Sequence, residues 1–325
     1  MKDSWSCRDY QSGDENQILT LNNEFNDRKM TLEHWAWKFT KNPFGKALIK
    51  LMFNGEKLIG HRGAIPMVVS IQGRDIPSAQ TVNNLTHPDY RRLGISTHLA
   101  KAICEEAKEQ GIKFMYNFIN PDSYLVHSKI DVWQILDQRS AWGKKLPTKS
   151  TSAMLCSSAI KQVERFDRRV NRLWDRVNQD YMVVVPRTAK FLNWRFTQHP
   201  TEEYSKFIIE DNSEEISGYL VLKVYRRGDE VKGHIIDMLC PNSEAIVKSL
   251  LDYSYNFFIE KGIRNLTCWM PESFFHTSVL REEGFTTAIM ETRCGIWILD
   301  KQERLLEKAR HIRNWHLTMG DSDVF

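Results

Sequence analysis

A seven-residue segment near the N-terminus returns, slightly changed, in the second half of the chain. Trp-Lys-Phe-Thr-Lys-Asn-Pro at residues 37–43 reappears as Trp-Arg-Phe-Thr-Gln-His-Pro at residues 194–200. Two further pairs of segments keep the same order: residues 109–113 with 260–264, and 121–123 with 271–273. Three matches in one order indicate a diverged duplication, so the sequence predicts two copies of one folding unit. The 325 residues, 42% of them apolar, suffice for two hydrophobic cores.

The first copy contains a segment that is typical of a phosphate-binding loop. Residues 78–86 have the pattern of a strand, Pro88 ends it, and an apolar residue recurs at every fourth position from Ile95 to Ala107, as on one face of a helix. Gly94 permits close backbone approach, and the free amides of a helix start attract an anion. The predicted helix ends at Gly111, and a second strand follows over residues 112–119. An ordinary turn with two solvated arginines is the alternative.

The residues from His87 to Ser96 resemble the acetyl-coenzyme A loop of the GCN5-related N-acetyltransferases (GNAT), whose pattern is Arg/Gln-x-x-Gly-x-Gly/Ala. Arg91 and Gly94 match, and Ser96 stands at the last small position. The segment from Gly13 to Leu21 resembles the first loop and helix of that fold, so the resemblance covers roughly residues 4–142. It implies an α/β (α+β) fold of two tandem GNAT-like lobes, each a mixed central sheet flanked by helices.

The resemblance also implies a cofactor site, with acetyl-CoA as co-substrate and no metal. The strand backbone would pair with the pantetheine arm, an amide near Leu85 would polarise the thioester carbonyl, and the loop amides would hold the pyrophosphate. The residues so assigned are Leu85, Thr86, His87, Arg91, Arg92, Leu93, Gly94, Ile95, Ser96, Thr97 and Asn120.

The groups that would transfer protons are less well defined by the sequence. Residues 78–87 contain no acidic side chain, so the base is a water chain, His61, or a residue of the second copy. The proton donor to the thiolate is a tyrosine in the family. Aligning Lys129 with the family's late element places His127 at that tyrosine, whereas aligning Trp133 places Ser128 there. Tyr124, one turn earlier, is the only phenol nearby. Water itself is the remaining proton donor.

The second copy departs from the pattern at the loop. The strand over residues 233–240 ends at Pro241, and residues 242–246 contain neither glycine nor arginine. Glu244 suits a helix start but repels phosphate. The segment from Leu280 to Phe285 resembles the family's late Tyr-x-Lys-x-Gly-Phe element, with leucine in place of tyrosine. We therefore expect cofactor binding in the first copy only.

These features predict three segments: residues 1–145 form the acetyl-CoA-binding domain, 146–180 a linker and connecting helix, and 181–325 the degenerate GNAT-like domain. The polar stretch 141–158 has the composition of a linker, and residues 161–176 that of a basic amphipathic helix with solvated arginines.

Composition excludes several classes of protein. A net charge of +4 is too small to indicate nucleic-acid binding. No run of ~20 apolar residues predicts a membrane span, and the N-terminus lacks a signal-peptide core, so a cytoplasmic protein is expected. Six widely spaced cysteines without a Cys-x-x-Cys pair indicate reduced thiols rather than a zinc site.

Taken with the resemblance, the sequence predicts an acyltransferase that moves the acetyl group of acetyl-CoA to a small-molecule amine by direct attack in a ternary complex. Similarity to acetyltransferases of bacterial surface-polysaccharide biosynthesis favours an amino sugar as acceptor. Four tryptophans either line an acceptor cleft or pack in cores: Trp37, Trp133, Trp142 and Trp269. A peptidoglycan-bridge-type aminoacyl transferase and a non-catalytic acyl-CoA sensor are the alternatives. The oligomeric state is not indicated.

Overall fold

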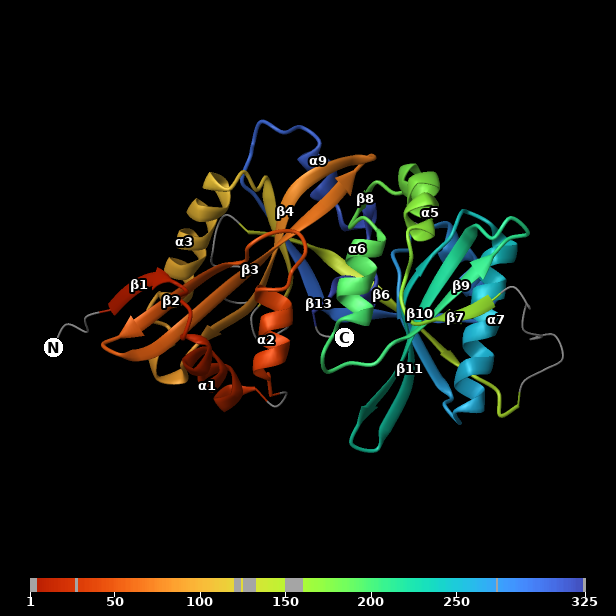
Figure 1. Ribbon diagram of the computed structural model, residues 1–325, viewed down its shortest axis with the longest axis horizontal. Helices are drawn as coiled ribbons and strands as arrows, with labels where there is room; N and C mark the ends of the chain where they lie inside the picture. The colour runs from red at the N-terminus through yellow and green to blue at the C-terminus, as the bar shows by residue number, and fades with distance from the viewer. Residues whose placement is uncertain are drawn as a thin grey trace. The chain divides into compact units, whose positions relative to one another are not determined.

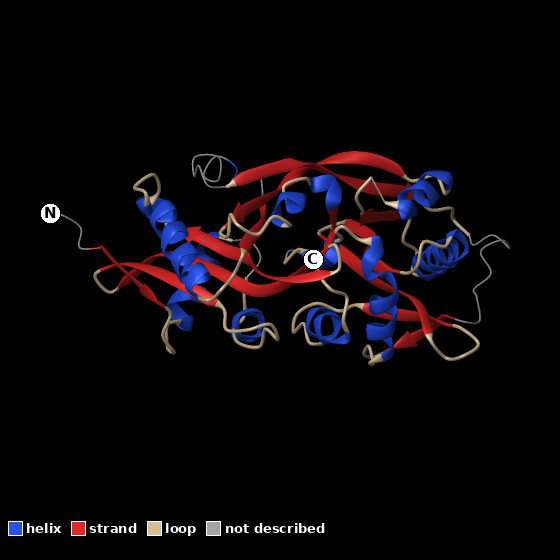
Figure 2. Ribbon diagram, turned by 90° about the horizontal axis from the view of Figure 1, so that it is seen from above, coloured by secondary structure: helices blue, strands red, loops and turns tan. Residues whose placement is uncertain are grey.

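The computed structural model describes residues 5–26, 29–119, 124, 133–149, 160–272 and 274–323. The chain divides into two compact units whose segments interleave along the sequence (Figure 1). The first lobe consists of Met1–Val69, Asp75–Leu136 and Arg293–Arg310, and the second lobe of Ser70–Arg74, Asp137–Thr292 and His311–Phe325. Each lobe is a mixed sheet flanked by helices, as predicted (Figure 2).

The first lobe is built on strands in the order β1-β2-β3-β4-β5-β13. Their bounds are β1 Trp5–Asp9, β2 Leu48–Asn54, β3 Lys57–Ile71, β4 Arg74–Thr86, β5 Phe114–Ile119 and β13 Thr286–Ile298. The helices are α1 Glu15–Phe25, α2 Leu32–Phe39, α3 Ile95–Glu109 and α9 Leu306–Ala309, with a 3₁₀ turn η1 at Pro88–Tyr90. A Cβ on Gly60 of β3 would meet Ile95 and Leu99 of α3, and one on Gly63 would meet Phe39 of α2. Because these glycines are an odd number of residues apart, α3 and α2 cover opposite faces of the sheet (Figure 1).

The second lobe repeats this plan with strands in the order β6-β12-β11-β10-β9-β7. Their bounds are β6 Gln134–Lys145, β7 Ile160–Val163, β9 Ser205–Glu210, β10 Ile216–Arg227, β11 Glu230–Leu239 and β12 Asn265–Trp269. The helices are α5 Arg169–Val177, α6 Ala189–Leu192, α7 Glu244–Glu260 and α8 Phe275–Glu282. A short parallel pair, β8 Val183–Val184 with β14 Trp315–His316, fixes the C-terminal residues within this lobe.

The helix-to-strand corners confirm that the two copies share one fold. Gly111 follows α3 with φ of 76°, and Gly262 follows α7 with φ of 72°. The next amides make equivalent bonds: Ile112 donates to Ala107, and Ile263 donates to Phe258. Both corners therefore end a helix on a left-handed glycine.

The strand that follows β5 in the chain belongs mainly to the other lobe. Residues 141–145 of β6 pair with β12 of the second lobe, and residues 293–298 of β13 pair with β5 of the first. The expectation of a linker from residue 141 is therefore wrong for residues 141–145. The compact units also interleave, whereas the sequence suggested consecutive segments divided at residues 145 and 180.

The basic segment 161–176 is a helix only in its second half. Residues 161–163 lie in β7, and α5 begins at Arg169. Its apolar face is buried as expected, but its arginines are not simply solvated. Arg169 donates to Glu210 at 2.8 Å, and Arg172 pairs with Glu215 at 2.6 Å. Acidic partners within the lobe thus neutralise this helix.

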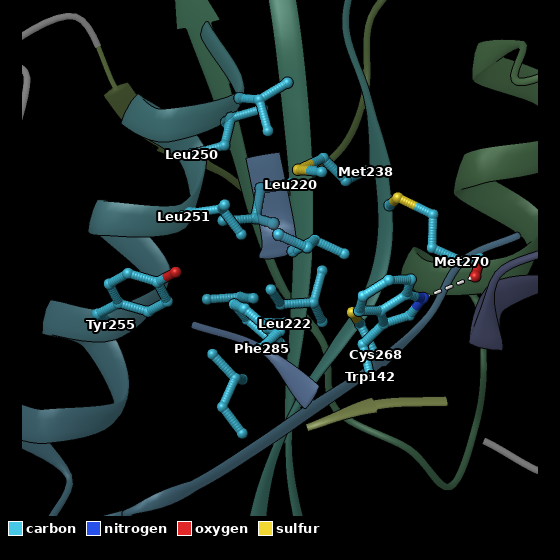
Figure 3. Close-up of a cluster of buried hydrophobic side chains, with 14 of the residues drawn as sticks. Trp142, Leu220, Leu222, Met238, Leu250, Leu251, Tyr255, Cys268, Met270 and Phe285 are labelled. Atoms are coloured by element: carbon cyan, nitrogen blue, oxygen red, sulfur yellow. Dashed lines mark hydrogen bonds between the residues drawn. The ribbon is translucent and has the colours of Figure 1, made fainter. Parts of the chain in front are cut away.

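The core of the second lobe lies between α7 and the sheet (Figure 3). Leu220 and Leu222 of β10 point toward Leu250 and Leu251 of α7 (Figure 3). Trp142 is 1% exposed, and its Nε1 donates to the Met270 carbonyl at 2.8 Å. Trp142 is therefore a core residue rather than the lining of a cleft. The other three tryptophans, Trp37, Trp133 and Trp269, are also buried.

The structure also bears on the predictions about membrane spans and cysteines. Among the described residues, no helix combines the length and apolar character that a membrane crossing requires. The five described cysteines are free thiols: Cys7, Cys104, Cys240, Cys268 and Cys294.

Candidate active site

Strands β4 and β5 run parallel but pair over only three residues each. The segment from Ser78 to Gln80 lies opposite Phe114 to Tyr116. β4 then continues to Thr86, while β5 pairs along its other edge with β13. Between the described parts of β4 and β5, no ladder continues past Gln80. Past Gln80, the edge of β4 thus has no described ladder partner on β5, and its backbone can pair with an extended ligand.

A left-handed residue, Asn83 with φ of 51°, bulges β4 beside the split. Its side chain accepts a hydrogen bond from Lys38 Nζ at 3.2 Å and donates to Asn22 Oδ1 at 3.3 Å. Both partners belong to the α1/α2 side of the sheet. These polar contacts hold the bulge in place, because a non-glycine residue at positive φ needs local compensation.

His61 of β3 completes the support of the bulge. Its Nδ1 lies 2.7 Å from the Asn83 carbonyl oxygen, so the ring proton is assigned to Nδ1 and the lone pair to Nε2. The side chain is 1% exposed, and burial lowers its pKa to about 4. His61 is therefore neutral at physiological pH.

The loop before α3 has the backbone of an anion site. Arg92 and Gly94 both have positive φ, 65° and 84°, on either side of Leu93. Gly94 is the N-cap of α3 without a side-chain cap, and the first turn of the helix carries no acidic residue. The amides of Ile95, Ser96 and Thr97 consequently point toward an open position that favours an anion.

The two loop arginines differ in how they are held. Arg91 donates from Nε to the Thr86 carbonyl at 3.3 Å, which ties the loop to the end of β4. Both guanidinium groups belong to exposed residues, as do Leu93 and Gly94. A diphosphate bound at the start of α3 would thus lie beside two exposed guanidinium groups.

At the end of β4, the backbone groups of Leu85, Thr86 and His87 do not all face the split. The His87 amide donates to the Ile59 carbonyl of β3 at 2.9 Å. Since alternate residues of a strand point to opposite neighbours, Leu85 also faces β3, and Thr86 and Asn84 face the split. The His87 ring packs against Phe25 and Tyr90.

Of the candidate proton donors, Tyr124 is described and is half-buried. Its ring lies 4.6 Å from the Arg293 guanidinium carbon of β13. His127, Ser128 and Asn120 lie outside the described residues. Among the residues that are described, no group of three or more His, Cys, Asp or Glu side chains is arranged to hold a metal ion.

The corresponding loop of the second lobe has no anion site of this kind. Between β11 and α7, residues 240–243, no residue has a positive φ. Glu244 opens α7 and pairs with Lys248 at 2.6 Å. The strand split is nevertheless preserved, because β11 pairs with β12 only from Gly233 to Ile235.

Sequence reasoning missed two features of the first lobe. One is the bulge at Asn83, which an asparagine pair in a strand could have suggested. The other is Arg62, which is 1% exposed inside the lobe although its sequence position carries no motif.

Comparison with known proteins agrees with this geometry. Residues 6–124 match the family model described as an acetyltransferase (GNAT) domain. No curated protein matches the chain. Solved structures with similar folds include a GCN5-related N-acetyltransferase from Anabaena variabilis, at 17% identity and TM-score 0.69, covering 91% of this chain and 73% of that one.

Two further solved structures align over nearly the whole chain. A probable N-acyltransferase from Enterococcus faecalis aligns at 12% identity and TM-score 0.70 over 92% of this chain and 74% of its own. Saccharomyces cerevisiae N-myristoyltransferase, solved with myristoyl-CoA, aligns at 11% identity and TM-score 0.64 over 92% and 80%. Residues 6–124 thus match a GNAT acetyltransferase domain, and the two-lobed fold of the chain is similar to that of GNAT-family N-acetyltransferases.

Proposed function

We propose that this protein is an N-acyltransferase that takes an acyl group from acyl-CoA, bound in the first lobe, and transfers it to an amine. The observation that carries the proposal is the combination of an uncapped helix start after left-handed Arg92 and Gly94 with the split between β4 and β5. The first suits a diphosphate, and the second suits the extended amide-bearing arm of coenzyme A.

In this proposal the thioester lies along β4 near the bulge. The backbone groups of Thr86 and Asn84 pair with the pantetheine amides, because these residues face the split. A strand amide at this edge stabilises the negative charge that develops on the thioester oxygen when the amine attacks. The amides at the start of α3, from Ile95 to Thr97, hold the diphosphate, with Arg91 and Arg92 beside it.

The proton transfers follow from the surroundings of the split. With its pKa lowered to about 4, His61 is a weak base at neutral pH. We therefore assign it to holding the bulge, and we expect water to take the proton from the attacking amine. Tyr124 is the proposed donor to the departing thiolate. Acetyl-CoA as donor and an amino sugar as acceptor rest on the sequence resemblance.

A matched pair of double variants tests the proposed cofactor site. Arg91→Glu with Gly94→Asp introduces two negative charges where the diphosphate would bind, and we expect acetyl-CoA affinity to fall at least 100-fold. The control, Ser243→Glu with Ala245→Asp, changes the equivalent turn of the second lobe and should leave affinity unchanged. Calorimetry measures binding, and thermal unfolding without ligand verifies that both proteins fold.

Release of free thiol separates an enzyme from a sensor. Acetyl-CoA should raise the unfolding temperature in either case, because it binds the native state. Only an enzyme releases free CoA faster when small amines, including amino sugars, are added. If acetyl-CoA neither stabilises the protein nor produces heat in calorimetry, the proposal is wrong.

A further inference from the structure

Arg62 is a buried, ionised side chain that meets no counter-charge in the part of the chain that the structure describes. It is 1% exposed, and none of its three guanidinium nitrogens has a hydrogen-bond partner among the described residues. Burial lowers its pKa to about 10, so it still carries a positive charge at neutral pH. An uncompensated buried charge is among the most destabilising features of a folded protein, so its presence calls for an explanation.

The side chain of Arg62 extends toward the split between β4 and β5. It starts from β3 on the face that α3 covers, two residues from Gly60. Its guanidinium carbon lies 6.0 Å from the centre of the Trp133 ring. That ring reaches to within 3.2 Å of where a Cβ on Gly295 of β13 would be. The Trp133 ring is thus close both to the guanidinium of a β3 residue and to β13, two strands that β4 and β5 separate.

Two further polar groups are buried without a described partner on the same face. The Thr81 hydroxyl belongs to the first residue of β4 beyond its last pair with β5, and the Asn84 Oδ1 atom follows the bulge. The bond from His87 to Ile59 sets the register of β4 on β3 and places Asn84 directly opposite Arg62. Thr81 shares the α3 face with Ala79, a member of the core under that helix.

A cation and a hydroxyl without described partners thus lie on the same face of β3 and β4, beside the start of the split. This is the end of the split away from the diphosphate loop, where the acyl group of a thioester held along β4 would extend. A carboxylate accepts hydrogen bonds from the guanidinium and from the hydroxyl, whereas an alkyl chain would leave both unpaired.

We propose that Arg62, with Thr81, binds a terminal carboxylate on the acyl group, so that the preferred donor is a dicarboxylic acyl-CoA such as succinyl-CoA. This inference rests on the proposed function, because it assumes that the thioester occupies the split. It differs from that function in naming the chemistry of the acyl group. It assigns Arg62 a binding role in place of a structural one.

The decisive measurement compares two thioesters of equal chain length. Succinyl-CoA and butyryl-CoA each carry a four-carbon acyl group, with and without the carboxylate. Calorimetry with the whole protein should show succinyl-CoA binding at least tenfold more tightly, with unmodified CoA as the reference. Equal or weaker binding of succinyl-CoA overturns this inference and leaves the proposed function standing. If none of the three binds, the proposed function itself is wrong.

Variants at the site keep the test independent of folding. Arg62→Met should bring the ratio between the two thioesters to one or below while leaving the affinity for CoA unchanged. It should also raise the unfolding temperature of the ligand-free protein, because it removes an uncompensated charge. A large fall in that temperature would reveal a structural partner and overturn the proposal.

Two further variants sharpen the result. Thr81→Val removes one hydroxyl at almost constant volume, and we expect the preference for succinyl-CoA to fall severalfold with butyryl-CoA binding unchanged. Arg74→Met replaces an exposed arginine at the start of the same strand β4, and it should not alter the ratio between the two thioesters. A loss of preference in Arg74→Met would show that the effect is one of general charge and would contradict the role of Arg62.

Discussion

Both lobes bury an arginine beside the central sheet, and the two arginines have opposite surroundings. In the second lobe, Arg187 is fully buried between Asp237, at 3.1 Å, and Asp321, at 2.7 Å. Arg62 of the first lobe is buried to the same degree but meets no carboxylate among the described residues. In the second lobe, the buried arginine thus binds Asp321 near the C-terminus. The buried arginine of the first lobe has no such structural ion pair among the described residues.

The repeated segment shows the same divergence at one equivalent position. Lys38 of the first copy bonds to Asn83 and so supports the bulge of β4. Its counterpart Arg195 donates instead to the carbonyls of Gly320 and Ser322, near the C-terminus. Arg195 thus holds the C-terminal residues within the second lobe, whereas Lys38 supports the strand beside the split.

The largest effect is expected from breaking the ion pairs of the second lobe. Arg187→Met leaves the carboxylates of Asp237 and Asp321 buried without the guanidinium that neutralises them, and we expect it to cost about 3–5 kcal/mol of stability. The control Arg172→Met breaks an exposed pair with Glu215 and should cost less than about 1 kcal/mol. Urea unfolding measures both. A loss below about 1 kcal/mol for Arg187→Met would contradict the contrast with Arg62.

Acid should destabilise the protein through its buried histidines. The second lobe contains His234 and His276, whose pKa burial lowers to about 4, and His316, whose pKa burial lowers well below its usual value. Between pH 6.5 and pH 4 the unfolded chain binds protons at these sites and the folded chain does not, so stability falls as pH drops through this range. Each site with a folded pKa of about 4 costs about 2 kcal/mol at pH 5.

Replacing these side chains should remove the corresponding part of the pH dependence. The double variant His234→Gln with His276→Gln should reduce the loss of unfolding free energy between pH 7.5 and pH 5 by about 4 kcal/mol. His61→Gln should reduce that loss by about 2 kcal/mol. Urea midpoints at the two pH values give the comparison between the lobes. An unchanged slope in the double variant would mean that these histidines are protonated in the folded state.

Replacing the strand glycine that contacts a helix should cost a similar amount of stability in each lobe. A Cβ on Gly63 would lie 2.6 Å from the Phe39 ring, and one on Gly233 would lie 2.8 Å from the Phe258 ring. Each glycine-to-alanine change should cost about 1–3 kcal/mol, because an aromatic ring must move. Gly143→Ala is the control, since the nearest atom would be 3.9 Å away. Thermal unfolding ranks the three variants.

How far the sequence predicts this structure depends on whether a feature is local. The strand, loop and helix from residue 78 to Gly111 were predictable, because proline, glycine and apolar spacing act over neighbouring residues. The pairing of β6 with β12 was not, because partner choice depends on the other end of the chain and residues 141–145 show no strand alternation. Arg62 was invisible for a related reason: burial is set by tertiary packing, and an arginine in a strand is usually exposed.

The smallest effect tests why the two helix starts differ. Glu244 at the start of α7 interacts favourably with the helix dipole and with Lys248, so Glu244→Gln should cost about 0.5 kcal/mol. Ser96→Glu places the same charge in the first turn of α3, where it should add about 0.5 kcal/mol of stability and weaken acetyl-CoA binding at least tenfold. Urea unfolding and calorimetry measure the two changes. If Ser96→Glu leaves binding intact, the diphosphate does not lie at the start of α3, and the difference between the two loops would then reflect stability alone.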